Sequence, residues 1–282
     1  MKKNHFPANL SCPLDGEPLS FYDGQLRCPK NHSFDIARQG HVNLLPVQFK
    51  RSKDPGDSKA MIEARQRFLD SGFYKPIADA LVAQVSEILR DSSSCCILDA
   101  GCGEGYYLDR LWQSLDQERL ECIGLDISKP AILAATRRNK ETTWIVGSNK
   151  HLPVLPDSVD IIICLFGFPV WEEFARALKP GGRVVLIDPG PEHLIELRRI
   201  IYDSVKQTPA PKLEQAKQTG FSLDNSQILQ FTSEELNHEQ IMDLLTMTPH
   251  LYRASQKGRD AAQQLPGLAV TVDILIRTVT RT

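Results

Sequence analysis

Residues 95–107 read C-C-I-L-D-A-G-C-G-E-G-Y-Y, and residues 120–128 read L-E-C-I-G-L-D-I-S. Two apolar runs of strand character therefore flank a glycine-rich turn and a helical segment. The three glycines between Gly101 and Gly105 lack a Cβ atom, so the backbone can turn sharply and a ligand can lie against it. The second strand ends in Asp126, where an acid accepts hydrogen bonds from ribose hydroxyls in units of this kind. The stretch predicts an α/β domain with a ligand site at the carboxyl ends of its strands.

The turn has two interpretations, a purely structural connection or a ligand cradle. Its pattern is G-x-G-x-G, which does not match the fingerprint for a pyrophosphate. The first strand ends in its own acid, Asp99, and Glu104 lies within the turn. These carboxylates would repel a pyrophosphate and favour a cationic ligand.

The stretch L-D-x-G-C-G-x-G resembles the first cofactor motif of the S-adenosylmethionine-dependent methyltransferases. Their cofactor carries a sulfonium, an ammonium and an adenosine, which acids at the strand ends would suit. The stretches G-S-x-x-x-L-P (147–153), D-S-V-D (157–160) and L-K-P-G-G (178–182) resemble the same superfamily. The resemblance implies that Ile127 packs on the adenine and that Ser148 or Asn149 meets its edge.

The apolar periodicity predicts the other elements. The expected strands are 144–147, 161–164, 184–187, 227–232 and 269–279, and the expected helices are 58–90, broken at Gly72 and resuming at Pro76, then 193–205 and 238–245. Asp57 or Ser58 would cap the first helix. The fold class is α/β, a Rossmann-like class I methyltransferase with a seven-stranded mixed sheet completed by an antiparallel last strand.

Composition limits the class of protein. The 282 residues carry a net charge of −2 and a pI of about 6.4, so any RNA surface must be local. No apolar run is long enough to span a membrane, and the N-terminal residues show no secretory apolar core. The seven cysteines show no disulfide spacing, so the expected location is the reducing cytoplasm.

The sequence predicts that residues 1–45 form a separate unit, with hairpins at Asp-Gly turns. Tetrahedral Zn²⁺ needs four ligands from two turns, and Cys12, Asp15, Cys28 and His32 have that spacing. A C-P-x-C knuckle would place a second thiolate at position 15, where this chain has aspartate. The alternative is a hairpin unit that holds no metal. His5, Asp35 and His41 are further candidates whose spacing fits no knuckle.

Residues 46–60 have the composition of a linker, and residues 61–282 form the predicted methyltransferase domain. The linker concentrates Lys50, Arg51 and Lys53, which would contact phosphates or form a solvated loop. Ion pairs with Asp54 and Asp57 are a third interpretation.

The whole chain closely resembles the RlmA family of 23S rRNA guanine-N1 methyltransferases. The motifs that carry the resemblance are C-P-x-x (12–15), C-P-x-x-H (28–32), N-L-L-P-V-Q (43–48), K-R-S-K-D-P-G-D-S (50–58), F-L-x-x-G-x-Y (68–74), L-D-x-G-C-G-E-G-Y-Y (98–107), P-G-P-x-H-L (189–194) and L-L-x-M-T-P (244–249). The resemblance implies methyl transfer to N1 of a guanine in a large-subunit rRNA hairpin. It also implies a homodimer whose zinc-ribbon-like units help to hold the RNA.

The family resemblance implies cofactor contacts at Tyr74, at the turn from Gly101 to Gly105 and at His193, and the complete set of predicted contacts adds the strand-end acids and the superfamily positions named above. The complete set is Tyr74, Asp99, Gly101, Cys102, Gly103, Glu104, Gly105, Tyr106, Asp126, Ile127, Ser148, Asn149 and His193. Cys12, Cys28 and His32 match the family's zinc ligands, whereas Asp15 departs from the family pattern. Phe166 and Phe168 would face the methyl acceptor, where they could stack on a flipped-out base or pack in the core.

The chemistry requires a base, because guanine N1 carries a proton at neutral pH. Asp54, Asp57, Asp188 and His193 are the candidates, with Asp57 preferred. Three other hypotheses compete with methylation of one particular guanine. They are a methyltransferase for a small molecule, an rRNA-binding module that has lost catalysis, and methyl transfer to a neighbouring guanine.

Overall fold

The computed structural model describes residues 6–50, 52–90, 94–205 and 211–282. Its centre is an eight-stranded mixed sheet in the order β10-β13-β9-β8-β5-β6-β7-β4. The strands are β4 (Val42–Asn43), β5 (Cys95–Ala100), β6 (Leu120–Asp126), β7 (Thr143–Val146), β8 (Val159–Leu165), β9 (Leu178–Pro189), β10 (Phe221–Thr232) and β13 (Thr271–Arg281). The parallel strands β5, β6 and β8 are mostly apolar and almost entirely buried, as expected for a sheet covered on both faces.

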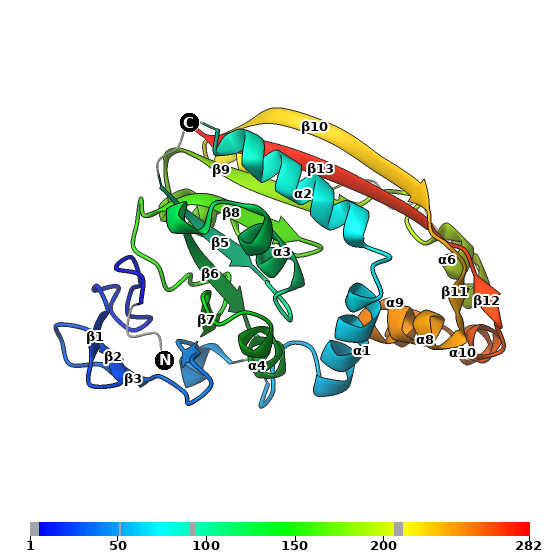
Figure 1. The fold of residues 1–282 in the computed structure, drawn as a ribbon, viewed down its shortest axis with the longest axis horizontal. Helices are drawn as coiled ribbons and strands as arrows, with labels where there is room; N and C mark the ends of the chain where they lie inside the picture. Colours follow the sequence, from blue (N-terminus) through cyan, green and yellow to red (C-terminus); the bar gives the residue numbers. More distant parts are fainter. Residues whose placement is uncertain (1–5, 51, 91–93, 206–210) are drawn as a thin grey trace.

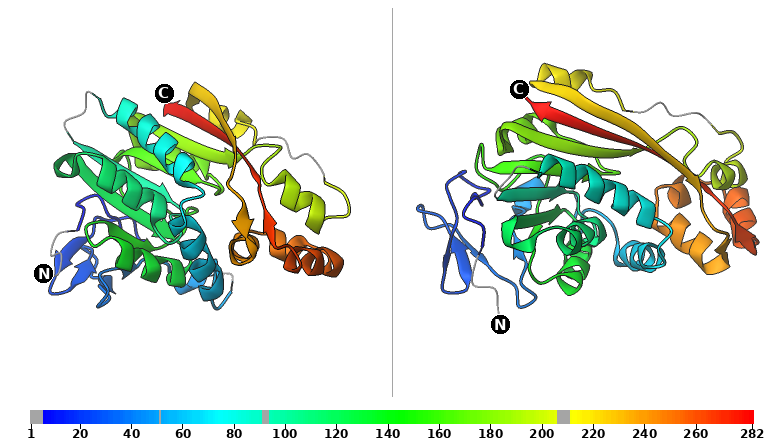
Figure 2. Two further views of the ribbon diagram at one scale, coloured as in Figure 1. Left: turned by 45° about the vertical axis from the view of Figure 1, so that its right-hand side comes forward. Right: turned by 45° about the horizontal axis from the view of Figure 1, so that its top comes forward.

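The last strand takes the antiparallel position that the sequence predicts. β13 runs antiparallel to β9 on one side and to β10 on the other. The long β10–β13 pair runs along one long side of the molecule and extends towards the C-terminal helices (Figures 1 and 2). β9 and β10 are both longer than predicted, because β9 includes the L-K-P-G-G stretch and β10 begins at Phe221.

The prediction of seven strands was wrong by one. The eighth strand, β4, comes from the N-terminal unit and pairs in parallel with β7, through Val42 opposite Ile145 and Asn43 opposite Val146. Val42 is fully buried in the apolar core that the sheet shares with the N-terminal unit. β4 thereby covers an edge of β7 that would otherwise present unpaired backbone groups.

Helices cover both faces of the sheet. They are α1 (Lys59–Asp70), α2 (Lys75–Ile88), α3 (Tyr106–Ser114), α4 (Lys129–Arg138), α5 (Trp171–Ala177), α6 (Ile195–Ile201), α7 (Glu214–Gln218), α8 (His238–Met247), α9 (His250–Arg253) and α10 (Gln256–Gln263), with 3₁₀ turns η1 (Val47–Phe49) and η2 (Gln117–Arg119) and a small pair of strands, β11 (Leu236–Asn237) and β12 (Gly267–Leu268). α2, α3, α6 and α8 share one apolar core with the sheet, and α5, α7 and the N-terminal unit share the other. In the described part of the chain, no helix has the length and apolar character needed to cross a membrane.

The N-terminal unit is a three-stranded antiparallel sheet of β1 (Ser20–Tyr22), β2 (Gln25–Arg27) and β3 (Ser33–Asp35). Asp23 and Gly24 join β1 to β2 with φ values of 45° and 79°, as a tight hairpin turn requires. Leu10 and Leu26 are fully buried, and Leu10 forms an antiparallel bridge with Val154, in the segment between β7 and β8. The unit is therefore docked on the main sheet.

Two local predictions concern helix starts. Ser58 caps α1, because its side chain accepts a hydrogen bond from Met61 N–H, as predicted. The placement of His193 in a first helical turn was wrong, because α6 begins at Ile195. Leu194 has a left-handed φ of 55°, which separates His193 from the helix.

Candidate functional site

The glycine-rich turn leaves β5 with three left-handed residues. Gly101, Gly103 and Gly105 have φ values of 104°, 56° and 85°. The N–H groups of Gly101 and Cys102 donate to the Leu125 carbonyl at the end of β6 (2.8 and 3.0 Å). A Cβ atom on Gly101 would meet nothing within 4 Å, whereas one on Gly105 would lie 2.7 Å from the Trp144 ring. Gly101 therefore presents open backbone to a ligand, and Gly105 permits packing on the core.

Two carboxylates mark the strand ends beside this turn. Asp126 accepts hydrogen bonds from Gly103 N–H (2.9 Å) and Ser128 N–H (2.7 Å), one on each oxygen. Asp99 is 2% exposed, and no described residue donates a hydrogen bond to its carboxylate. Burial, followed by the nearby Asp126 carboxylate, raises the pKa of Asp99 well above its ordinary value. A cationic ligand beside Asp99 would relieve that cost.

The expected adenine side of the site contains an amide with an unsatisfied oxygen. Asn149 Nδ2 donates to the Ala100 carbonyl (3.1 Å), while the buried Asn149 Oδ1 has no partner in the described structure. An unsatisfied buried acceptor needs a donor, and the exocyclic amine of an adenine supplies one. Ser148 Oγ instead accepts from Lys150 N–H (3.3 Å), and Ile127 is half-buried at the tip of β6.

Glu104 does not point at the open face of the turn. Its Oε2 accepts from Arg138 Nε (2.8 Å), and Arg138 also pairs with Asp70 (2.9 Å). Burial raises the pKa of Glu104 to about 7, against the opposing effect of Arg138. This network ties the turn to α1 and α4. Glu104 therefore contributes less negative potential to a ligand than the sequence indicates.

Two further members of the predicted contact set face inward or away. The buried Cys102 Sγ approaches the Gly103 carbonyl (3.6 Å) and would lie 3.2 Å from a Cβ atom on Gly124. Tyr106 packs under the Arg138 guanidinium, 5.5 Å from its ring centre. Its neighbour Tyr107, which was not among the predicted contacts, has a buried hydroxyl near Tyr74 that makes no hydrogen bond within the described residues.

Tyr74 and His193 meet although 119 positions separate them. His193 Nε2 lies 3.2 Å from the Tyr74 hydroxyl, and Asp273 N–H donates to His193 Nδ1 (3.3 Å). Because Nδ1 accepts, the proton of the neutral ring must be on Nε2, which donates to Tyr74. The Tyr74 hydroxyl then keeps its own proton for another acceptor. Phe166 stacks on Tyr74 with ring centres 6.3 Å apart, and it has a φ of 53°, unusual for a bulky residue.

The Asp273 side chain holds the turn that carries His193. Asp273 Oδ2 accepts from Glu192 N–H (2.9 Å), and the backbone carbonyl of Asp273 accepts from Gly190 N–H (2.7 Å). A Cβ atom on Gly190 would lie 2.3 Å from this carboxylate. The sequence contained no signal for Asp273, because it reaches the site from β13.

Acidification is expected to destabilise the protein through its buried histidines. Burial, followed by His250 and Arg198, lowers the pKa of His193 to about 4. The unfolded chain therefore binds a proton between about pH 6.5 and 4 that folded His193 rejects, so stability falls as the pH falls through this range. The loss from His193 is about 3 kcal/mol. His250, whose pKa burial also lowers to about 4, adds to the effect.

Urea unfolding of the wild type and of His193→Gln between pH 7 and 4 tests this expectation. The variant should show the smaller loss of unfolding free energy. His151→Gln, which changes an exposed histidine stacked on Phe49, is the control and should follow the wild type. Parallel losses in the wild type and His193→Gln would contradict the assignment.

The candidate bases differ in what they contact. Asp57 Oδ2 pairs with Arg65 Nη2 (2.7 Å), and the Asp57 carbonyl accepts from Ser128 Oγ (2.7 Å), so the linker lies beside the turn. Asp188 Oδ2 is bound by the buried Arg277 (2.6 Å). Asp54 is exposed. Both ring nitrogens of His193 are engaged, which leaves it no lone pair for a substrate proton.

The basic and aromatic candidates for RNA contact lie at the surface. Lys53 is exposed and Lys50 partly exposed, whereas Arg51 and His5 lie outside the described residues. Phe168 is 88% exposed, and Phe21 and Tyr22 project from the N-terminal unit. Exposed aromatic rings of this kind suit base stacking.

The four predicted metal ligands converge. One ligand atom from each of Cys12, Asp15, Cys28 and His32 lies within 4.8 Å of all the others. Asp35 instead accepts from Gln25 Nε2 (2.8 Å), and His41 is buried elsewhere, with its pKa lowered by burial and then by Lys129. The spacing argument thus selected residues that the fold brings together.

The cluster has the dimensions of a zinc site. His32 Nδ1 lies 3.5 Å from the sulfur atoms of both Cys12 and Cys28, and Asp15 Oδ2 lies 3.3 Å from Cys28 Sγ. Tetrahedral bonds of about 2.3 Å to sulfur and 2.0–2.1 Å to nitrogen imply a separation of about 3.5 Å. Although burial opposes it, hydrogen bonds from Cys12, Glu17 N–H, Cys28 and His32 lower the pKa of Asp15 to about 2, so it is ionised as a ligand must be.

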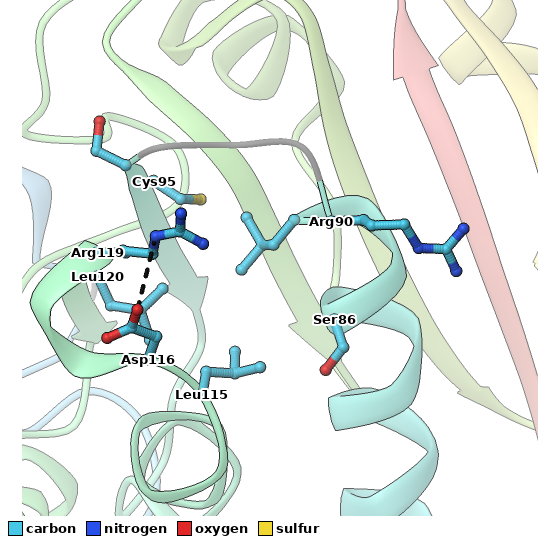
Figure 3. Close-up of a pocket in the computed structure, with 9 residues that line it drawn as sticks. Ser86, Arg90, Cys95, Leu115, Asp116, Arg119 and Leu120 are labelled. Carbon is cyan, nitrogen blue, oxygen red and sulfur yellow. Dashed lines mark ion pairs between the residues drawn. The ribbon is translucent and has the colours of Figure 1, made fainter.

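Two cavities lie away from the open face of the turn. One of about 220 Å³ is lined by Ser86, Arg90, Cys95 and Arg119 at the amino ends of β5 and β6 (Figure 3), and there Arg119 pairs with Asp116 (3.6 Å). The other, of about 270 Å³, includes Asp70, Tyr106 and Arg138 behind the turn. Ligands of parallel sheets bind at the carboxyl ends of the strands, so the first cavity is at the wrong end for the predicted site.

Known proteins match both parts of the chain. Residues 10–53 match the family described as "RlmA, N-terminal", and residues 97–182 match "Methyltransferase domain". The chain is 29% identical over 280 residues to "Putative 23S rRNA (guanine-N(1)-)-methyltransferase YxjB" of Bacillus subtilis (strain 168), covering 97% of this chain and 98% of that protein.

Two relatives from other bacteria are 34% identical. One is the "23S rRNA (guanine(748)-N(1))-methyltransferase" of Streptomyces fradiae, over 189 residues, 67% of this chain and 66% of that protein. The other is the "Putative 23S rRNA (guanine-N(1)-)-methyltransferase" of Micromonospora griseorubida, over 211 residues, 67% of this chain and 68% of that protein.

Proposed function

Because the chain belongs to the family of 23S rRNA (guanine-N(1)-)-methyltransferases, we propose that it transfers a methyl group from S-adenosylmethionine to N1 of a guanine in large-subunit rRNA. The observation that carries the proposal is the open turn at Gly101, flanked by Asp99 and Asp126, in one chain with the N-terminal unit. The turn suits the cofactor, and the unit suits the RNA.

The residues around the turn complement the parts of S-adenosylmethionine. Asp99 is a buried carboxylate suited to the cationic amino acid end, and Asp126 can accept from the ribose hydroxyls. Ile127 and Asn149 Oδ1 suit the face and the edge of the adenine. Tyr74, with its hydroxyl proton directed away from His193, completes the wall.

Methyl transfer forms a bond from guanine N1 to the methyl carbon and breaks the bond from that carbon to the sulfonium. The N1 proton passes to a base, and the products are N1-methylguanine and S-adenosylhomocysteine. We assign the base to Asp57, whose carboxylate lies beside the turn. In-line attack demands accurate positioning, which the hydrogen bonds that hold the turns at Gly101 and His193 favour.

The RNA side of the proposal uses the exposed groups. The target guanine would stack on Phe168, while Lys50 and Lys53 contact phosphates. We propose residues 1–45 as the RNA-holding unit, 46–60 as the basic linker and 61–282 as the catalytic domain. An rRNA hairpin as target, a homodimer as the active form and a cytoplasmic location belong to the same proposal.

Zn²⁺ would be held by Cys12, Asp15, Cys28 and His32, where it would fix the two turns of the N-terminal unit. Burial raises the pKa of Cys12 to about 11, so ionisation of this thiol depends on metal binding.

Replacement of Asp15 by cysteine is expected to tighten zinc binding by about tenfold or more, because a thiolate is the softer ligand. Asp15→Ala should release the metal. Competition with a chromogenic chelator and metal analysis of the purified protein measure both effects. Asp35→Asn, an acid of the same unit outside the cluster, is the control and should retain the wild-type affinity. Equal zinc affinity in all four proteins would exclude Asp15 as a ligand.

The activity is tested with labelled S-adenosylmethionine and undermethylated rRNA, followed by digestion and mass spectrometry of the product. N1-methylguanosine at one position is the expected result. Methyl transfer to small molecules alone would refute the RNA substrate. Failure to bind the cofactor would refute the enzyme function.

A further inference from the structure

Arg65 of α1 lies directly over the glycine-rich turn. Its Nη1 would be 3.2 Å from a Cβ atom on Gly103, so the guanidinium packs on the turn where only glycine leaves room. The charge of Arg65 also favours the ionised forms of Asp126, Glu104 and Tyr107, so the guanidinium lies close to the acidic groups of the turn. The sequence motifs gave it no role.

The guanidinium is fixed through one nitrogen. Arg65 Nη2 donates to the Met247 carbonyl at the end of α8 (3.1 Å) and pairs with Asp57 Oδ2 (2.7 Å). Nη1 makes no hydrogen bond within the described residues. The L-L-x-M-T-P stretch thus has a structural role, because its Met247 carbonyl orients Arg65. A planar guanidinium held in this way presents a fork of donors suited to a carboxylate.

The electrostatics of the turn call for such a cation. Asp57 and Asp99 both lie close enough to Asp126 to interact with its charge, and together the three acids would repel the carboxylate of the cofactor's methionine moiety. Arg138 also lies beside the turn, but Glu104 and Asp70 bind it. Arg65, with Nη1 3.2 Å from a Cβ atom built on Gly103, is in position to bind a ligand carboxylate lying on Gly101 and Gly103.

On the premise of the proposed function, we infer that Arg65 binds the carboxylate of the methionine moiety, and that this carboxylate competes with Asp57 for the guanidinium. When the cofactor carboxylate takes the fork, the Asp57 carboxylate is released beside the acceptor side of the turn. Cofactor binding thereby prepares the base that accepts the N1 proton. The order of binding is cofactor first and RNA second.

Two adenosine ligands distinguish the contribution of the carboxylate to affinity from the contribution of the rest of the cofactor. S-adenosylhomocysteine carries the amino acid end, and 5′-methylthioadenosine lacks it. Arg65→Gln is expected to weaken S-adenosylhomocysteine by about 10- to 100-fold in calorimetric titrations, because one charge-assisted contact is lost. The affinity of the Arg65→Gln variant for 5′-methylthioadenosine should stay at the wild-type value.

Arg67→Gln is the matched control. It makes the same change two residues further along α1, where Arg67 binds Asp243 at the surface (3.0 and 2.5 Å). This variant should bind both ligands as the wild type does. Asp57→Asn, which removes the competing charge, should bind S-adenosylhomocysteine about two- to fivefold more tightly.

The outcomes separate the inference from the function on which it rests. If the wild type binds neither ligand, the proposed function fails. If the wild type binds both and Arg65→Gln weakens them equally, Arg65 supports the turn and the carboxylate assignment is overturned. If Asp57→Asn leaves the affinity unchanged or lowers it, the competition is overturned.

Discussion

Replacing Asp126 with alanine is expected to weaken S-adenosylhomocysteine binding by more than about a hundredfold and to abolish methyl transfer. The carboxylate holds the turn through Gly103 N–H and the start of α4 through Ser128 N–H. It is also the proposed acceptor for both ribose hydroxyls. The variant therefore loses both the contact with the ribose and the hydrogen bonds that fix the shape of the glycine-rich turn. Calorimetric titration measures the affinity, and labelled methyl incorporation measures the rate.

Asp160→Ala provides the control for this experiment. Asp160 Oδ2 also accepts from a backbone N–H, that of Cys96 (2.8 Å), but at the opposite end of the sheet. Loss of this bond should lower stability without changing cofactor affinity. Wild-type affinity in Asp126→Ala would remove Asp126 from the cofactor site, and a comparable loss of affinity in both variants would point to general unfolding.

Replacing Gly124 with alanine is expected to cost about 3 kcal/mol of stability, a melting temperature lower by about 10 °C. A Cβ atom there would lie 2.1 and 2.3 Å from atoms of the Trp144 ring. Trp144 is 1% exposed, and its Nε1 donates to the Asn139 carbonyl (2.8 Å), so the ring has no room to retreat. Urea unfolding and thermal melting measure the loss.

Two comparisons test that explanation. Trp144→Phe should recover part of the stability in the Gly124→Ala background, because the smaller ring leaves space for the methyl group. Gly147→Ala should cost less, because its nearest neighbour is the flexible end of Leu125, at 2.8 Å. No recovery by Trp144→Phe would show that the cost has another origin.

The strand and turn pattern of the catalytic domain could be predicted because its signals are local. The apolar runs that end in Asp99 and Asp126, and the glycines between them, occupy the places expected for them. The eighth strand could not be predicted, because β4 has two residues and its partner is about a hundred positions away. Neither propensity nor periodicity specifies so short a pairing.

The residues of the candidate site also fall into two groups, those that local spacing predicts and those that only the tertiary fold brings together. Residues at strand ends and in knuckles, such as Asp126 and Cys12, follow from spacing alone. Arg65 and Asp273 reach the site from α1 and β13, so only the three-dimensional fold brings them there. Glu104 shows the converse, since a residue inside the motif turns towards Arg138. Position in a motif did not determine the direction of its side chain.

The pairing of β4 with β7 has a consequence for biosynthesis. A ribosome produces Val42 and Asn43 well before Ile145 and Val146, their partners in the sheet. At about 5–20 residues per second, translation takes several seconds or more to reach that partner. During this interval the surface on which the N-terminal unit docks has not yet been synthesised, and Val154, the partner of Leu10, is also missing. Early metal capture by Cys12, Cys28 and His32 would keep the unit compact until translation reaches β7.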